Sequence, residues 1–265
     1  MPRLVLQNNQ IFTAYLNQLN GNDVVFGGTD PVGSTTPALN IIGDTALNTV
    51  SVTGTAATPE HGIIGMGKVV SLTVNNGVHL SNGTLSVNES PVDHFALNGV
   101  STLDSNSTLT VAGFIGAGAA AVNGAVWLRS GSTLDMGSDA VTGAGSVNLA
   151  GGTTLARLGS VGSDIVVNLN RGVLALADGM HFLGTVHEQA PAVTEVFNAT
   201  SAVKEIFSQS TGVLDLLDVQ GAKVAEINFG AGSSPLYATP DAMTGSMDIT
   251  HTQHANSLPV LLSNG

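Results

Sequence analysis

A seven-residue pattern recurs along the middle of this 265-residue chain, and the distance between its copies varies. The pattern is Leu, two variable residues, Gly or Asn, a hydroxyl residue, Thr and Leu. Full copies begin at Leu103, Leu128 and Leu149, and a shortened copy spans Leu80 to Leu85. Start positions 25 and 21 residues apart give a period in the twenties, which is typical of a solenoid.

Hydrophobic residues alternate with polar ones on both sides of the Gly or Asn. Val126 and Leu128 precede Gly131, and Leu134 and Met136 follow it. Alternation at period two predicts short strands with one buried face. Because Gly supplies a bend with positive φ between two such strands, the pattern predicts an all-β fold. The predicted fold is a right-handed parallel β-helix (a β-solenoid), whose coils stack about 4.8 Å apart.

An antiparallel β-sandwich remains the alternative, because Asn-Gly dipeptides favour hairpin turns. Five such dipeptides occur, at residues 20–21, 76–77, 82–83, 98–99 and 123–124.

The repeat also predicts which side chains fill the lumen of the coils and which form the corners. Gly131 and Gly152 are predicted at corners. The predicted lumen residues are Leu103, Leu109, Leu128, Leu134, Leu149 and Leu155.

Three regions follow from these patterns: an N-terminal cap at 1–25, a solenoid core at 26–190 and a C-terminal module at 191–265. Solenoids need caps, and helical spacing predicts a short capping helix near each end. The N-terminal set is Ile11, Phe12, Tyr15, Leu16 and Leu19. The C-terminal set begins with Pro191, a favourable first helical residue, and continues with Val193, Val196, Phe197, Val203, Ile206 and Phe207. After it come a β-arch, with strands predicted within 214–221 and 223–229, and an irregular tail.

Charge and composition exclude several classes of function. Seven Lys and Arg against nineteen Asp and Glu give a net charge of −12, which leaves no basic surface for a nucleic acid. No apolar run approaches the roughly 18 residues of a membrane span, so membrane insertion of this segment is not expected. The chain has no cysteine, which excludes disulfides and thiolate catalysis.

At residues 126–136 and 145–155 the chain resembles secreted bacterial β-solenoid proteins, namely autotransporter passengers and repetitive adhesins. The stretch 214–229, followed by 245–250, is similar to a unit found near the ends of such exported proteins. The resemblance implies a secreted or cell-surface location. It also implies adhesion, biofilm or surface architecture, or display of an embedded enzyme.

Two glycine-rich segments nearly match phosphate-binding motifs. The segment from Gly62 to Val69 has Lys68 in the expected place, but Val69 stands where Ser or Thr would hold magnesium. The segment from Gly116 to Ala121 lacks a following helix. We therefore interpret both as structural.

Histidines supply two further candidates. His251 and His254 have a spacing that would chelate a metal from a helix, and His181 or His187 with Glu188 would form an acid–base pair. In both cases an exposed histidine without such a role is the simpler interpretation.

A carbohydrate-active β-helix enzyme, a polysaccharide lyase or hydrolase, is the alternative function. Such enzymes use paired carboxylates or acidic residues beside a base. The candidates are Asp135 and Asp164 with Arg129, Arg157 and Arg171.

The sequence favours an extracellular or cell-surface structural or adhesive module without catalysis of its own. Its expected partner is a surface glycan, a protein or another copy of itself. No catalytic, cofactor-binding or metal-binding residue is assigned.

Overall fold

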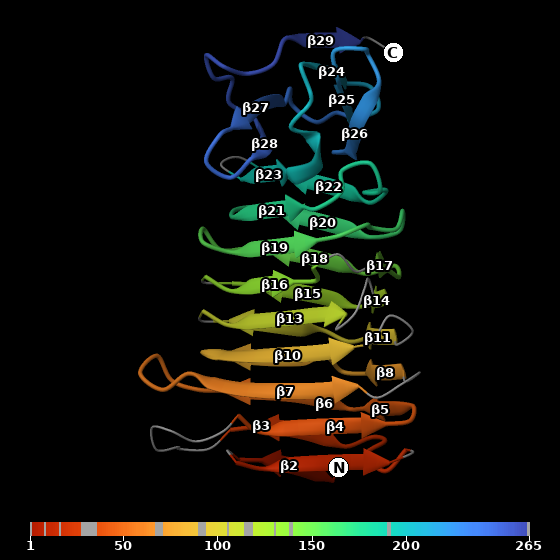
Figure 1. Ribbon diagram of the computed structural model, residues 1–265, viewed down its shortest axis with the longest axis vertical. Coiled ribbons are helices and arrows are strands. Elements are labelled where there is room, and N and C mark those ends of the chain that lie inside the picture. Colours follow the sequence, from red (N-terminus) through yellow and green to blue (C-terminus); the bar gives the residue numbers. More distant parts are fainter. Residues whose placement is uncertain are drawn as a thin grey trace.

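The computed structural model describes residues 2–7, 9–15, 17–27, 36–66, 71–89, 94–104, 106–113, 119–129, 131–137, 140–189 and 192–263. Strands make up 55% of the chain and helix 1%. Parallel strands stack into a β-solenoid of about seven turns along the long axis of the molecule (Figure 1). The predicted solenoid is thus confirmed over the sandwich.

Three sheets form the walls of the coils. In order of pairing, the first sheet contains β1 (Arg3–Leu6), β3 (Asp23–Phe26), β6 (Thr49–Thr53), β9 (Val78–Ser81), β12 (Ser101–Asp104), β15 (Ala125–Leu128), β18 (Ser146–Leu149), β20 (Val166–Leu169), β22 (Thr185–Glu188), β26 (Lys223–Asn228), β25 (Val213–Leu217), β24 (Lys204–Ser208) and β29 (Val260–Ser263). The second contains β2 (Ile11–Tyr15), β4 (Ala38–Ile42), β7 (Glu60–Met66), β10 (Gly83–Glu89), β13 (Thr108–Gly113), β16 (Thr133–Asp135), β19 (Leu155–Leu158), β21 (Val173–Leu176), β23 (Val193–Val196), β28 (Ser246–Thr250) and β27 (Tyr237–Asp241). The third contains β17 (Ala140–Thr142), β14 (Ala119–Val122), β11 (His94–Leu97), β8 (Ser71–Val74) and β5 (Thr45–Leu47).

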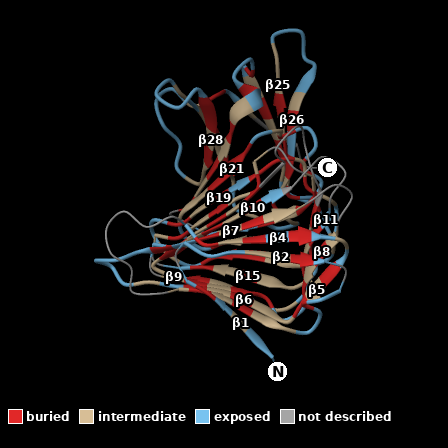
Figure 2. Ribbon diagram, turned by 60° about the horizontal axis from the view of Figure 1, so that its bottom comes forward, coloured by how far each residue is buried: buried red, intermediate tan, exposed pale blue. Residues whose placement is uncertain are grey.

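Parallel register places like side chains above one another, so the lumen is built from aliphatic columns (Figure 2, where buried segments line the inside). One column of the first sheet consists of Leu80, Leu103, Leu128, Leu149 and Leu169. One column of the second sheet consists of Leu85, Leu109, Leu134, Ala156 and Leu174. All ten side chains are buried, which confirms the predicted lumen positions of Leu103, Leu109, Leu128, Leu134 and Leu149.

The prediction for Leu155 is wrong. Leu155 is only half-buried, and Ala156 takes the lumen position above Leu134. Leu128 pairs with Leu149 whereas Leu134 pairs with Ala156, so the turn after Leu149 holds one more residue than the turn after Leu128. A shift of one residue along a strand turns every side chain to the opposite face.

The two predicted corner glycines behave differently. Gly131 has φ of 77° and forms the predicted corner. Gly152 is exposed in the equivalent turn and has no positive φ, so the longer turn does not depend on a glycine there. A different glycine, Gly124, is closely confined: an added Cβ would lie 1.9 Å from the carbonyl oxygen of Gly99 in the coil below.

The predicted N-terminal helix is a strand. Residues Ile11–Tyr15 form β2, which pairs in parallel with β4 and buries Ala14, while Ile11 is 72% exposed. Asn9 and Asn17 adopt positive φ on either side of the strand. Because these left-handed residues turn the chain at both ends, the segment between them is too short for an amphipathic helix. Leu16 lies outside the described residues.

The predicted C-terminal helix is also wrong. Its residues form β23, one turn of 3-10 helix, η1 (Phe197–Ala199), and β24. Strand pairing explains the difference, because β23 continues the parallel stack on β21 and β24 pairs antiparallel with β25. Pro191 lies outside the described residues.

Beyond β23 the pairing becomes mostly antiparallel. The predicted strands near 214–221 and 223–229 are β25 and β26, joined by a turn. The tail, which we expected to be irregular, contains the antiparallel hairpin of β27 and β28 and the strand β29. Among the described residues, no helix has the length and apolar character needed to span a bilayer.

Candidate functional site

One side chain from each of six consecutive coils stands in a row on the outer face of the first sheet. These residues, called here the outer stripe, are His79, Thr102, Trp127, Asn148, Asn168 and His187. Five of the six stand immediately before the buried leucines of the first-sheet column, because neighbouring residues of a strand point to opposite faces. The coil spacing sets one stripe residue about every 4.8 Å.

Hydrogen bonds order the polar members of the stripe. The amide nitrogen of Asn168 donates to Oδ1 of Asn148 at 2.7 Å, and Nδ1 of His79 lies 3.1 Å from Oγ1 of Thr102. The guanidinium of Arg129 lies 5.9 Å from the centroid of the Trp127 ring, a distance at which a cation is attracted to the ring face. The stripe therefore combines one aromatic surface with a row of hydrogen-bonding groups.

At the last parallel coil, polar residues replace the aliphatic residues of the two lumen columns. Above Leu169 of the first sheet stands Glu188, and above Leu174 of the second sheet stands Thr194. The hydroxyl of Thr194 donates to Oε2 of Glu188 at 2.9 Å. Two aliphatic columns thus end in one polar pair, at the junction with the antiparallel strands.

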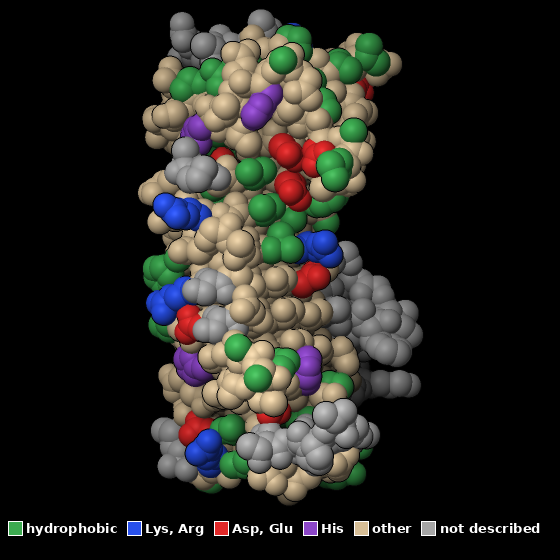
Figure 3. Space-filling model, turned by 90° about the vertical axis from the view of Figure 1, so that its left-hand side faces the viewer, with side chains coloured by type: hydrophobic (Ala, Val, Ile, Leu, Met, Phe, Trp, Pro, Cys, Tyr) green, Lys and Arg blue, Asp and Glu red, His purple; other side chains and the backbone are tan. Residues whose placement is uncertain are grey.

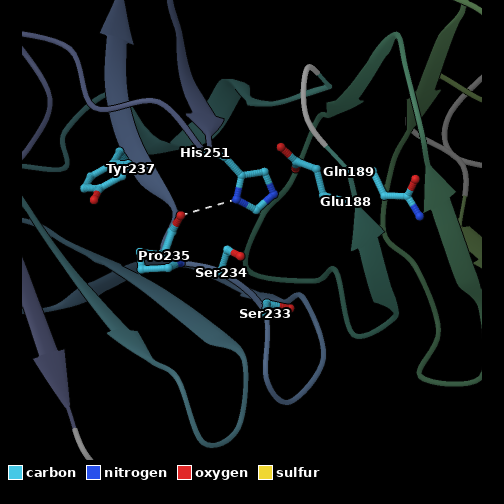
Figure 4. Close-up of a pocket in the computed structure, with 7 residues that line it drawn as sticks. All are labelled: Glu188, Gln189, Ser233, Ser234, Pro235, Tyr237 and His251. Carbon is cyan, nitrogen blue, oxygen red and sulfur yellow. Dashed lines mark hydrogen bonds between the residues drawn. The ribbon is translucent and has the colours of Figure 1, made fainter.

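A pocket of about 400 Å³ opens at this junction. Its lining residues come from the end of β22, the loop before β27, the start of β27 and the residue after β28: Glu188, Gln189, Ser233, Ser234, Pro235, Tyr237 and His251. Figure 4 shows the Glu188 carboxyl beside the His251 ring, with Tyr237 and Gln189 at opposite ends. Nδ1 of His251 lies 3.3 Å from the carbonyl oxygen of Pro235. Since a carbonyl only accepts, Nδ1 carries the proton and Nε2 of the neutral ring is an acceptor.

Burial raises the pKa values of two glutamates near this junction. Burial raises the pKa of Glu188 to about 8, against the opposing effect of the Thr194 hydrogen bond. Its Oε1 is shielded from solvent and has no hydrogen-bond partner among the described residues. Burial also raises the pKa of Glu205 on β24 to about 7, although Oε2 of this residue accepts from the Ala238 backbone amide. At neutral pH the Glu188 carboxyl is protonated and offers an O–H donor.

The predicted histidine pairs do not form. His187 is exposed on the outer face whereas Glu188 points inward, as alternation along a strand requires. His251 and His254 lie beyond the end of β28 in a segment without helix, and only His251 lines the pocket. The structure instead combines Glu188 with His251, 63 positions further along the chain. His181 contacts Asp178 in an exposed turn.

The predicted carboxylates Asp135 and Asp164 are not brought together. Asp135 stands on the outer face of the second sheet, where it contacts Arg157 at 3.5 Å and accepts from the Gly137 amide. Asp164 is exposed in the turn before β20 of the first sheet. Arg129 contacts Asp104 at 3.6 Å, and Arg171 is exposed in the turn before β21.

A different carboxylate pair occupies the outer face of the second sheet. Glu195 and Asp248 stand directly opposite each other on β23 and β28. Burial, and then the charges of Asp248 and Asp241, raise the pKa of Glu195. Burial, and then the charge of Asp241, raise the pKa of Asp248, against a hydrogen bond from Ser246. Sequence reasoning missed this pair because the two residues are 53 positions apart and antiparallel pairing was not predicted for 246–250.

The phosphate-loop candidates stay without support. Gly62 lies within β7, a strand rather than a loop, and Lys68 and Val69 lie outside the described residues, as do Gly116 and Gly118. Over the described part of the chain, no three His, Asp or Glu side chains are grouped so that they could hold a metal ion.

Comparisons with known proteins leave the fold and the site as the basis for a functional argument. No family model matches this chain, and the curated proteins yield no match.

Proposed function

We propose that this chain is an extracellular or cell-surface β-solenoid module with a structural and adhesive role, in the manner of secreted bacterial autotransporter passengers and adhesins. It has no catalysis of its own and binds a surface glycan. The observation that carries the proposal is the outer stripe, in which an aromatic ring and ordered amide, hydroxyl and imidazole groups repeat in register along the coil axis.

The repeat of the stripe suits a polysaccharide. One stripe residue occurs about every 4.8 Å, close to the length of one sugar residue in an extended chain. The Trp127 ring offers an apolar face to the C–H groups of a sugar, and Asn168 offers hydrogen-bonding groups to its hydroxyls. Asn148 is buried beneath this surface, where its amide accepts from Asn168 and donates to Val126 and Ser146. The coils hold these groups on strands rather than on loops, so little ordering is needed on binding.

The sparse charge of the molecule supports an uncharged partner. The net charge is −12 with only seven Lys and Arg, which disfavours nucleic acids and other polyanions. On the face shown in Figure 3, basic side chains are few and widely separated.

The binding experiment measures retention of the purified chain on immobilised neutral polysaccharides. Trp127→Ala should reduce affinity by about tenfold or more, the loss of roughly 1.4 kcal/mol or more. His79→Ala should reduce it less, and His61→Ala, on the outer face of the second sheet, serves as the matched control. Equal retention of Trp127→Ala and the parent would contradict the outer stripe as the binding surface.

The location is tested on cells that produce the natural protein. We expect an antibody against this chain to label intact cells or the culture medium, and external protease to remove the cell-bound signal. Recovery of the chain only after lysis would contradict a surface or secreted location.

The carbohydrate-active enzyme is the second candidate, favoured by the opposed pair Glu195 and Asp248. Directly opposed residues of antiparallel strands have Cβ atoms about 4.5–5.5 Å apart, so the two carboxyl groups lie on neighbouring strands of one face, where a pair of carboxylates could act on a glycosidic bond. Burial raises the pKa of both groups, which favours the protonated form that a general acid needs. If the chain releases reducing ends from a polysaccharide, Glu195→Gln and Asp248→Asn should abolish the release, whereas Asp164→Asn should not.

A further inference from the structure

We propose that the pocket between Glu188 and Tyr237 binds one uncharged sugar residue, as the terminal subsite of a glycan that lies along the outer stripe. This inference rests on the proposed adhesive function and names the class of glycan and a second site for it.

The pocket adjoins the end of the outer stripe. His187, the last stripe residue, precedes Glu188 of the pocket lining, and its Cε1 would lie 3.3 Å from a Cβ added at Gly230. The hydroxyl of Ser233, which also lines the pocket, donates to the carbonyl oxygen of Gly230 at 2.8 Å. A glycan following the stripe toward the C-terminal strands therefore reaches the pocket at its last residue.

The polar groups of the lining match a polyhydroxylated ligand. Protonated Glu188 donates, Nε2 of His251 accepts, and Gln189 and the serine hydroxyls do both. Tyr237, one of only two tyrosines in the chain, supplies an aromatic ring at one end of the pocket (Figure 4). Among the described residues that line the pocket there is no Lys or Arg, so no permanent positive charge there compensates the charge of an acidic sugar.

Glu188 has unused hydrogen-bonding capacity in this pocket. A buried polar atom without a partner costs free energy, and Oε1 is such an atom. The terminal torsion of a glutamate is broad, and contact with a ligand hydroxyl would require a rotation that turns this shielded oxygen toward the pocket. The volume of about 400 Å³ falls in the range of about 300–1,000 Å³ of small-molecule sites.

The position of Glu188 in the fold argues that the carboxyl serves binding rather than packing. The equivalent residues of the five coils below it are leucines. A leucine at this position would continue the column and remove the buried Oε1, but it would leave the buried Thr194 hydroxyl without its acceptor. The substitution Glu188→Leu therefore tests binding, and Glu188→Gln, which still accepts from Thr194, is its partner variant.

The experiment titrates the full chain with neutral hexaoses of glucose, xylose and mannose and with hexagalacturonate, by calorimetry and saturation-transfer NMR. We expect at least one neutral hexaose to bind and hexagalacturonate not to bind. Tyr237→Ala and Glu188→Leu should weaken binding by about tenfold or more, and circular dichroism checks that both variants remain folded. Glu188→Gln, which keeps a donor and an acceptor, should retain most of the affinity.

Tyr15→Ala is the matched control, because Tyr15 is an exposed tyrosine at the opposite end of the solenoid. Unchanged binding by Tyr237→Ala and Glu188→Leu, together with loss in Trp127→Ala, would overturn the pocket and leave the stripe intact. Binding of hexagalacturonate alone would overturn the uncharged class. If no saccharide bound and Trp127→Ala had no effect on polysaccharide retention, the proposed function itself would fail.

Discussion

The stacked coils and the C-terminal strands build β-structure in opposite ways. From β4 to β22 every strand of the first and second sheets pairs in parallel with the coils before and after it, and the two columns that begin at Leu80 and Leu85 are aliphatic up to Leu169 and Leu174, although Glu60 of β7 is also buried. From β24 to β28 most pairs are antiparallel, and the interior contains the carboxyl of Glu205. Each turn of the stack leaves a strand edge on which the next turn pairs in parallel. In a hairpin the chain reverses, and the second strand pairs antiparallel with the first. The C-terminal strands thus end the stacking, and the boundary between the two regions carries the pocket.

We expect the largest loss in the free energy of unfolding when a charge is placed in the lumen of a coil. Leu134→Asp places a charge in the lumen column, where no basic partner is near, and should cost about 4 kcal/mol or more in the free energy of unfolding. Leu155→Asp alters the same repeat position in the next coil, but on its outer side, and should cost about 1 kcal/mol or less. Urea titrations followed by circular dichroism measure both. Similar losses in the two variants would show that the register at β19 is wrong.

Gly124, in a turn of the coils, should be less tolerant of substitution than Gly221, in a C-terminal turn. Gly124→Ala drives a methyl group into the Gly99 carbonyl of the coil below and should cost about 2–3 kcal/mol. Gly221→Ala, in a turn with φ of 81° and open space around it, should cost about 1 kcal/mol through backbone strain alone. Thermal unfolding compares them. A larger loss for Gly221→Ala would reverse the comparison.

The buried glutamates predict that stability falls as the pH rises. The pKa values of Glu188 and Glu205 rise from 4.5 to about 8 and about 7 in the folded chain. Between pH 4.5 and these values, the native state therefore binds more protons than the unfolded state. The free energy of unfolding is then highest near pH 4.5 with respect to these groups and decreases toward pH 8. Replacing both residues with Gln should flatten this dependence and stabilise the chain by about 2 kcal/mol at pH 8.

Glu226→Gln is the control for this pH dependence, because Glu226 is exposed and paired with Lys223. It should leave the decrease between pH 5 and pH 8 in place. A parent protein whose melting temperature is flat or rising across this window would contradict the burial of uncharged carboxyls at the junction.

Exposed ion pairs should contribute least in either region. Arg157→Ala removes the 3.5 Å contact with Asp135 in the coils, and Lys223→Ala removes contacts with Asp215 and Glu226 in the C-terminal strands. Each should cost less than about 1 kcal/mol, with the larger loss at Lys223 because it faces two carboxylates. Unfolding at low and high salt tests this, since salt screens exposed pairs. A loss at Arg157 as large as that of Gly124→Ala would contradict the expectation.

Much of the fold was predictable because strand alternation and corner residues are local signals. Val126, Leu128 and Leu134 were assigned correctly from period-two alternation around Gly131 alone. The two helix predictions were wrong because short apolar runs fit helical and strand periods equally well. Pairing with the neighbouring coil stabilises the strand in both cases.

The candidate sites were less predictable. The outer stripe has a sequence signal, since most of its members precede a lumen leucine, and aligning the repeat on those leucines would have shown it. The pocket has no such signal, because Glu188 and His251 meet only through the antiparallel return of the chain.

The sequence by itself determined that the chain forms stacked coils with an aliphatic lumen and little charge, because alternation and bends act within a few residues. Only the tertiary structure decided which residue stands above which. Partners in adjacent coils are 18 to 28 positions apart (174 − 156 and 80 − 52) and the turns between them differ in length, so one added residue after Leu149 turned Leu155 outward. The same accumulation of turn lengths set Glu188 above Leu169, and the antiparallel return of the chain brought His251 beside it.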